Sequence, residues 1–137
     1  MARWILSQHD YLVRSQMDKI FKYILMDANF DKVLDIGCGS RPYKSLFHNS
    51  IGIDYNSGDI HATGENLPIK SESVDLVFST QTLEHVEDPK TFLLEARRVL
   101  KPGGRIILST HGTYPIHADK DYWRWTDKGL GKLFKSV

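Results

Sequence analysis

Two glycines and two carboxylates are the residues of this sequence whose types and spacing most clearly indicate chemistry. Gly37 and Gly39 are separated by one residue, and Asp35 lies two positions before Gly37. Glycine adopts positive φ without strain and has no Cβ, so a ligand can lie directly against such a turn. Asp54 ends the next apolar segment, where a carboxylate can accept hydrogen bonds from both hydroxyls of a ribose. This spacing predicts a nucleotide-type site.

Other interpretations of these residues stay open. The glycine pair alone also fits an ordinary turn between a strand and a helix, and Asp54 alone also fits a solvated acid. A dinucleotide-binding turn is disfavoured, because its fingerprint needs a last glycine for close helix packing. This sequence has Arg41 and Pro42 there instead.

Length, charge and cysteine content set broad limits on the protein. A chain of 137 residues is expected to form one domain. With 18 basic and 17 acidic residues, the net charge of +1 gives no reason to expect nucleic acid or a membrane surface as a partner. The single cysteine, Cys38, excludes an internal disulfide and has no metal-type Cys or His spacing, so no metal is predicted. A cytoplasmic protein without membrane insertion is expected, because no segment approaches the ~20 apolar residues of a membrane helix.

The pattern of apolar residues predicts the elements that position these side chains. Short β-branched and apolar runs predict five strands, at residues 32–36, 51–54, 60–62, 74–80 and 105–110. Helices are predicted at residues 10–28, 42–47 and 88–100, with a last helix that Thr126 caps. Strands that alternate with helices indicate an α/β fold with a parallel sheet.

Two helical features carry specific expectations about packing and about the end of the chain. The first helix is expected to place an apolar stripe against the sheet, formed by Val13, Met17, Ile20, Phe21, Ile24 and Leu25. The last helix follows an aromatic-rich stretch at residues 121–125, which is expected to form a lid or a substrate wall. Plain packing of that stretch is the alternative.

Six short segments, in order, carry a resemblance to a known family: residues 33–39, 52–54, 65–68, 73–77, 83–89 and 100–104. Together they resemble the class I S-adenosylmethionine-dependent methyltransferases, and in particular the type 11 group, over about residues 30–111. The resemblance implies a doubly wound, Rossmann-like parallel sheet of order 3-2-1-4-5. It divides the single domain 1–137 into a helical segment (1–29), a cofactor-binding core (30–110) and a lid-like loop with the last helix (111–137).

The resemblance implies transfer of a methyl group from S-adenosylmethionine to an oxygen or nitrogen acceptor, with S-adenosylhomocysteine as the product. The acceptor is expected to be a small molecule or sugar-like compound. A catalytically inactive module that binds the cofactor is the alternative, and a nicotinamide oxidoreductase is a third. The family's sheet has seven strands, so the terminal hairpin is expected to be missing here. The strand at 105–110 would then be an edge that can pair with a second copy of the chain.

The resemblance also implies roles for individual residues. Asp35 and the backbone of Gly37, Cys38 and Gly39 would hold the methionine end of the cofactor, and Asp54 would hold the ribose hydroxyls. Tyr55 would flank the adenine. The adenine amino group would be met by one or more of Glu65, Asn66, Leu67 and Thr63. The methionine portion and the acceptor would be faced by Ser79, Thr80 and Gln81.

Three histidines are candidates for a general base, which a hydroxyl or ammonium acceptor would need. They are His85, His111 and His117, and His111 is the first choice because it directly follows a predicted strand. For each one, a structural or solvated imidazole is the alternative. Glu84 is expected to be a structural or cofactor-side carboxylate rather than a base.

Overall fold

The computed structural model describes residues 15–26 and 28–137. Residues 15–25 are helical, whereas the predicted start of this helix and Val13 lie outside the described residues. The strands and helices that follow are β1 (Val33–Ile36), the 3-10 helix η1 (Lys44–Leu46), β2 (Ser50–Asp54), β3 (Ile60–His61), β4 (Val74–Thr80), α2 (Pro89–Val99), β5 (Leu100–Ser109) and α3 (Asp127–Phe134).

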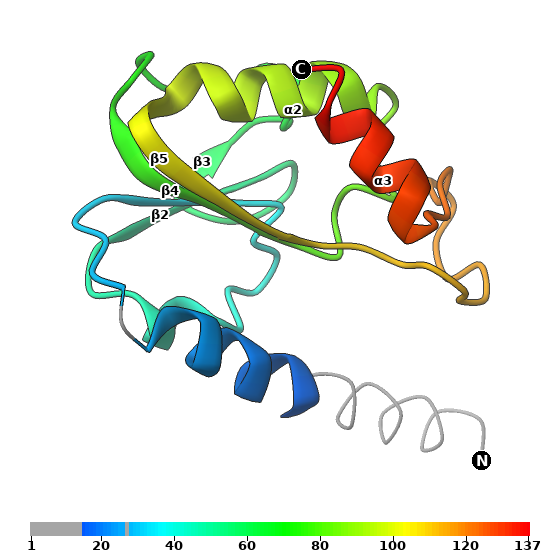
Figure 1. Ribbon diagram of the computed structural model, residues 1–137, viewed down its shortest axis with the longest axis horizontal. Helices are drawn as coiled ribbons and strands as arrows, with labels where there is room; N and C mark the ends of the chain where they lie inside the picture. Colours follow the sequence, from blue (N-terminus) through cyan, green and yellow to red (C-terminus); the bar gives the residue numbers. More distant parts are fainter. Residues whose placement is uncertain (1–14, 27) are drawn as a thin grey trace.

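The five strands form one parallel sheet in the order β3-β2-β1-β4-β5, which confirms the predicted order. Helices α2 and α3 lie on one face of the sheet, and the helix at residues 15–25 lies on the other (Figure 1). The chain moves outward from β1 to β3 and then returns to place β4 on the other side of β1. In open α/β sheets, ligands bind at the carboxyl ends of the strands beside such a reversal.

Local sequence signals explain the position of α2. Asp88 is its N-cap, and the Asp88 carboxylate accepts hydrogen bonds from the backbone N–H groups of Lys90 and Thr91 at 3.0 and 3.2 Å. Pro89 occupies the first turn, where a missing N–H group costs no hydrogen bond. The residues that α2 buries recur at the three- and four-residue steps of one helix face, namely Pro89, Phe92, Leu93, Ala96 and Val99.

The first helix contacts the sheet through a narrower stripe than the sequence predicted. Phe21 is buried, and Met17 and Leu25 pack against the same cluster. Ile20 and Ile24 are each 49% exposed, so their predicted contact with the sheet is wrong. Residues four positions apart form one line along a helix, and only the line of Met17, Phe21 and Leu25 reaches the core.

Strand β5 begins earlier than predicted. The sequence predicted this strand from residue 105, but β5 already starts at Leu100. Its pairing with β4 shifts between Val74 and Leu76, and Gly103 has a φ of +79°. A local bulge of this kind accommodates the proline and the glycines within a strand.

The outer side of β5 is one edge of the sheet. In the described part of the chain, no strand pairs with that side and no strand follows Ser109. Helix α3 packs Leu130, Leu133 and Phe134 against the core cluster that also contains the buried face of α2. The end of the chain therefore covers a face of the sheet rather than extending it with a strand. Within residues 15–26 and 28–137, no helix combines the length and the apolar character needed to cross a membrane.

Candidate functional site

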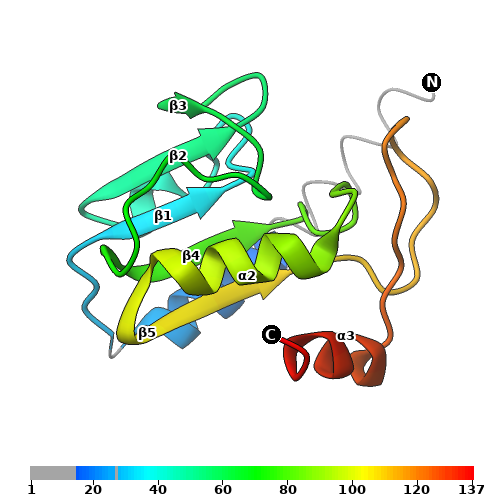
Figure 2. The same cartoon turned by 90° about the horizontal axis from the view of Figure 1, so that it is seen from above.

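A cavity of about 890 Å³ opens at the carboxyl ends of the strands, where the arrowheads point in Figure 2. Its size is in the range of sites that enclose a small ligand. The wall is formed by loops that follow β1, β2, β3 and β4, together with the start of α2 and two tail residues. The lining residues are 36–37, 54–56, 62–65, 81–82, 85–88, 91, 118 and 120.

The glycine turn after β1 lies against the loop after β4. Gly37 has a φ of +70°, and a Cβ at this position would lie 2.1 Å from Thr82 Oγ1. Gly39 has a φ of +48°, and a Cβ there would meet no atom of the described residues within 4 Å. A glycine is therefore required at position 37 because a Cβ would overlap Thr82. From the sequence alone, the only reason given for a glycine there was the approach of a ligand.

Asp54 closes the turn from the end of β2 and also lies on the cavity wall. Its two carboxylate oxygens accept hydrogen bonds from the backbone N–H groups of Gly39 at 3.1 Å and Asn56 at 3.0 Å. Burial raises the pKa of Asp54, but the N–H groups of Asn56 and Gly39 and the contacts with Ser57 outweigh it, so the pKa is lowered. The carboxylate is thus ionised at neutral pH where it lines the cavity.

Asp35 lies behind the turn rather than on the cavity wall. It is buried in β1, and burial raises the pKa of its carboxyl to about 6; Arg41 opposes this shift and Asp54 reinforces it. The neighbouring thiol of Cys38 is also buried, which raises its pKa to about 11, with Asp35 and Asp54 adding to the shift. Cys38 is therefore a neutral packing residue in this site.

The structure brings some of the predicted residues to the cavity and leaves others behind its wall. On the wall are Gly37, Asp54, Tyr55, Thr63, Glu65, Gln81 and His85. The predicted residues that do not line it are Asp35, Cys38, Gly39, Asn66, Leu67, Ser79, Thr80, His111 and His117.

Hydrogen bonds explain two of these differences. The Ser79 hydroxyl is fully buried and donates to the carbonyl of Ile36 at 2.8 Å. The backbone N–H of Leu67 donates to the Glu95 carboxylate at 2.9 Å. Neither group is free for a ligand, and both serve the packing of the fold.

The sequence did not single out several residues of the wall, among them Thr82, Asn56 and Thr91. No motif marks them, because they reach the cavity only through the packing of loops from separate strands.

Gln81 was predicted but has an unexpected conformation: its φ is +53°, which is rare for a residue other than glycine. Its amide donates to Ser109 Oγ at 3.0 Å.

The three candidate histidines gather around the buried carboxylate of Glu84. The His117 ring lies 5.0 Å from that of His85 and 4.9 Å from that of His111, between ring centres. Glu84 Oε2 accepts a hydrogen bond from Thr110 Oγ1 at 2.8 Å, and Oε1 lies 3.3 Å from His111 Nε2. Burial lowers the pKa of His111, Glu84 acts in the opposite direction, and His117 lowers it further.

The aromatic-rich stretch anchors the tail to the loop after β4. The backbone N–H groups of Tyr122 and Trp123 donate to the carbonyl of Glu84 at 2.8 and 3.2 Å. The indole of Trp123 donates to the carbonyl of Val86 at 2.8 Å. Of the tail, Ala118 and Lys120 reach the cavity wall, so the aromatic rings of this stretch pack beside the cavity rather than line it.

An open parallel sheet with a cavity and an ionised carboxylate at its carboxyl edge is the arrangement typical of nucleotide-binding α/β domains. A family model described as a methyltransferase domain matches residues 34–108, more than half of the chain. The chain therefore belongs to the methyltransferase domain family, as its motifs indicated.

Relatives and solved structures agree with this membership. A malonyl-[acyl-carrier protein] O-methyltransferase of Hahella chejuensis is 34% identical over 95 residues, which cover 69% of this chain and 33% of that protein. A ubiquinone biosynthesis O-methyltransferase of Cereibacter sphaeroides is 34% identical over 133 residues, covering 77% of this chain and 54% of that protein. The chain thus spans about a third to a half of the length of these relatives. A SAM-dependent methyltransferase of Thermotoga maritima shares the fold, with a TM-score of 0.75, 18% identity, and coverage of 98% of this chain and 77% of that one.

Replacement of Gly37 and Gly39 by alanine separates the two reasons for glycine in this turn. Both substitutions place a Cβ at positive φ, which costs about 1–2 kcal/mol. Only Gly37→Ala also forces a Cβ against Thr82, so it is expected to lower the free energy of unfolding more than Gly39→Ala does. Urea denaturation of the two variants measures the difference. Equal losses of stability would show that the contact with Thr82 does not constrain the turn.

Proposed function

We propose that this chain is the catalytic domain of an S-adenosylmethionine-dependent methyltransferase. The observation that carries the proposal is the cavity at the carboxyl ends of the strands, with the glycine turn and the ionised Asp54 on its wall. Membership of the methyltransferase domain family supports the choice of cofactor. The acceptor is proposed to be a small molecule, and an oxygen acceptor is favoured because the two relatives described above are O-methyltransferases.

The residues on the wall fit the parts of the cofactor. Each oxygen of Asp54 already accepts one backbone N–H, and a carboxylate has about four lone-pair sites. Ser57 also contacts this carboxylate, so the ribose hydroxyls would take the place of the Ser57 contacts. Tyr55 is 72% exposed beside Asp54 and offers a face for the adenine. Gly37 gives the methionine end access to the backbone, with the charge of Asp35 behind it.

Fewer residues can contact the adenine amino group than the four candidates that the sequence offered. The amino group donates and therefore needs an acceptor, and the Leu67 carbonyl already accepts from Arg98 at 3.0 Å. Glu65 Oε1 accepts a hydrogen bond from the backbone N–H of Glu87 at 3.0 Å. Glu65 and Thr63 lie on the wall. We assign the adenine contact to these two, with Glu65 using the oxygen that Glu87 leaves free.

S-adenosylmethionine would supply a methyl group that is already activated as a sulfonium, so the protein mainly has to align the acceptor and exclude water. The tail residues Ala118 and Lys120 close one side of the cavity and limit the access of water. Of the three candidate histidines, His85 is the one on the wall. We therefore assign the position beside the acceptor to His85 instead of His111.

Two other functions predict different behaviour. A module that binds the cofactor without catalysis would bind S-adenosylmethionine but transfer no methyl group to any acceptor. A nicotinamide enzyme is disfavoured by Arg41, whose guanidinium donates to the carbonyl and hydroxyl of Ser50 at 3.0 and 2.8 Å. The next residue, Pro42, stands at the position where a dinucleotide fingerprint needs its last glycine. Pairing of two copies through the outer edge of β5 stays a proposal, and so does the cytoplasmic location.

Replacement of Asp54 tests the proposed ribose contact. Asp54→Ala is expected to weaken the binding of S-adenosylhomocysteine by about 1–3 kcal/mol, because hydrogen bonds to a charged acceptor are lost. Isothermal titration calorimetry measures the change, and Cys38→Ala serves as the control that leaves the wall intact. Unchanged affinity in Asp54→Ala would contradict the ribose assignment.

The pH dependence of cofactor binding tests the role of Asp35. Its carboxyl has a pKa of about 6 in the free protein, so it loses its negative charge as the pH falls through this value. The attraction to the ammonium group of the cofactor is lost with it, and the affinity at pH 5 is expected to be about tenfold lower than at pH 7. Asp35→Asn is expected to bind weakly at both pH values. An equally steep pH dependence in Asp35→Asn would assign the effect to another group.

A further inference from the structure

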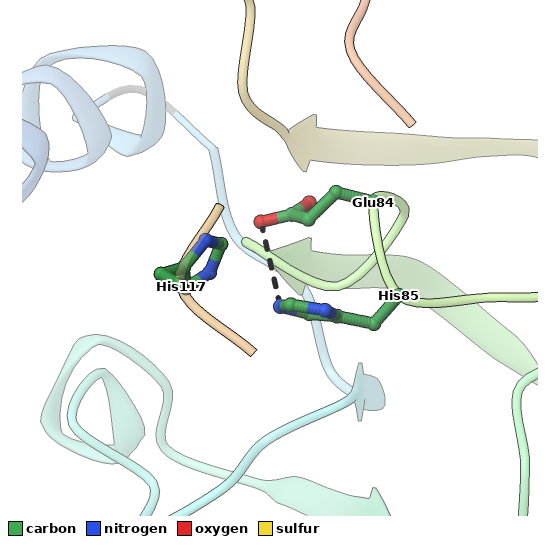
Figure 3. A group of neighbouring side chains, drawn as sticks. All are labelled: Glu84, His85 and His117. Carbon is green, nitrogen blue, oxygen red and sulfur yellow. Dashed lines mark ion pairs between the residues drawn. The ribbon is translucent and has the colours of Figure 1, made fainter. Parts of the chain in front are cut away.

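We propose that Glu84, His85 and His117 form a binding site for a divalent transition-metal ion beside the cavity. One possible ligand atom from each of the three residues lies within 4.8 Å of the other two. Figure 3 shows Glu84 and His85 on the turn after β4, with His117 approaching them from the tail. The sequence predicted no metal, because His117 is far from the other two ligands in the chain and only the docking of the tail brings it near.

The carboxylate of Glu84 is the first reason for this proposal. Its side chain is fully buried, and Oε2 accepts the hydrogen bond from Thr110. Oε1 has no hydrogen-bond partner among the residues that the structure describes. A buried carboxylate oxygen without a hydrogen bond is costly, and that cost is removed by a bound cation or by a protonated His111, whose Nε2 lies 3.3 Å away.

His85 presents the correct nitrogen to that oxygen. His85 Nδ1 lies 2.5 Å from the backbone carbonyl oxygen of Lys120. A carbonyl can only accept, so Nδ1 carries the proton and the neutral ring has its lone pair on Nε2. Nε2 lies 3.9 Å from Glu84 Oε1. At this distance a cation can lie between the Nε2 lone pair and the carboxylate oxygen.

His117 is oriented in the same way. Its Nδ1 lies 3.0 Å from a carboxylate oxygen of Asp121, which Arg124 holds through both of its terminal nitrogens. Nδ1 therefore donates to Asp121 and leaves Nε2 for a ligand. A histidine that binds a metal usually donates its other ring N–H to a carboxylate or a backbone carbonyl. Asp121 and the carbonyl of Lys120 supply one partner of each kind.

Distances and ligand types indicate which ions fit. Two donors that each bind an ion at about 2.1 Å can be at most about 4.2 Å apart. The pair of Glu84 and His85, at 3.9 Å, meets this limit. The two separations that involve His117 are at most 4.8 Å, so any excess over the limit has to close when the ion binds. Two imidazoles and one carboxylate suit zinc, iron, cobalt or manganese better than magnesium or calcium, which prefer oxygen ligands.

The position of the site gives the metal a role in catalysis. His85 lies on the cavity wall, so an ion bound to it would be next to the acceptor. A bound metal ion would lower the pKa of the acceptor hydroxyl, whose proton would pass to water. The oxygen would form its bond to the methyl carbon as the carbon–sulfur bond of the sulfonium breaks, and S-adenosylhomocysteine would leave. This role rests on the proposed function, whereas the binding of the metal does not. A protonated His111 that pairs with Glu84 is the metal-free alternative.

Titration of the chelator-treated protein with Zn²⁺ and Co²⁺ tests the proposal. We expect one ion per chain by calorimetry, and visible absorption bands of Co²⁺ in a low-symmetry site. His117→Ala and Glu84→Gln are expected to lower the affinity at least about 100-fold. Asp121→Asn is expected to lower it about 10–100-fold, because a partner of a ligating histidine is lost. Circular dichroism shows whether each variant is folded.

His48→Ala is the matched control, because His48 is exposed and lies in the loop before β2, outside this cluster. It is expected to bind the metal as the unchanged protein does. The proposal is wrong if the unchanged protein takes up no ion, or if His48→Ala loses as much affinity as His117→Ala. Binding of S-adenosylhomocysteine is measured on the same metal-free sample. If S-adenosylhomocysteine binds and the metal does not, the proposed function stands and the metal site is wrong. If the metal binds and S-adenosylhomocysteine does not, the metal site stands and the proposed function is wrong.

Discussion

The contact between Gly37 and Thr82 is the constraint on which the site depends. It joins the ends of β1 and β4, the two strands between which the direction of the fold reverses. Thr82 Oγ1 lies 3.4 Å from the carbonyl oxygens of both Ile36 and Gly37, so the two loops meet without room for a Cβ. The Ser79 hydroxyl, bonded to the carbonyl of Ile36, fixes the same junction from below. The ends of β2 and β3 supply other parts of the cavity wall, among them Asp54 and Ala62.

The second determinant is the docking of the tail on the loop after β4. The carbonyl of Glu84 accepts two backbone N–H groups from the aromatic-rich stretch, and the indole of Trp123 adds a third bond at Val86. These bonds fix the tail beside the cavity. They also carry His117 to Glu84 and His85, so one segment both limits the access of water and completes the proposed metal site.

Features encoded by neighbouring residues could be predicted from the sequence, whereas those that depend on distant segments could not. The N-caps Asp88 and Thr126 and the strand at residues 74–80 follow from local patterns, and the structure confirms them. The exposure of Ile20 and Ile24 was missed because an apolar pattern does not show how wide the contact with the sheet is. The early start of β5 was missed because proline and glycine usually end a strand rather than form a bulge. The role of Thr82 and the gathering of the histidines depend on packing between separate loops, for which one sequence has no signal.

The most direct test of the central claim, that the cavity is a site for S-adenosylmethionine, is a comparison of ligands by thermal shift on the unchanged chain. We expect S-adenosylmethionine and S-adenosylhomocysteine each to raise the Tm at saturating concentration, because a ligand that binds only the folded state stabilises it. NAD is expected to leave the Tm unchanged. A shift with NAD as large as that with S-adenosylhomocysteine, or no shift with any of the three, would contradict the claim.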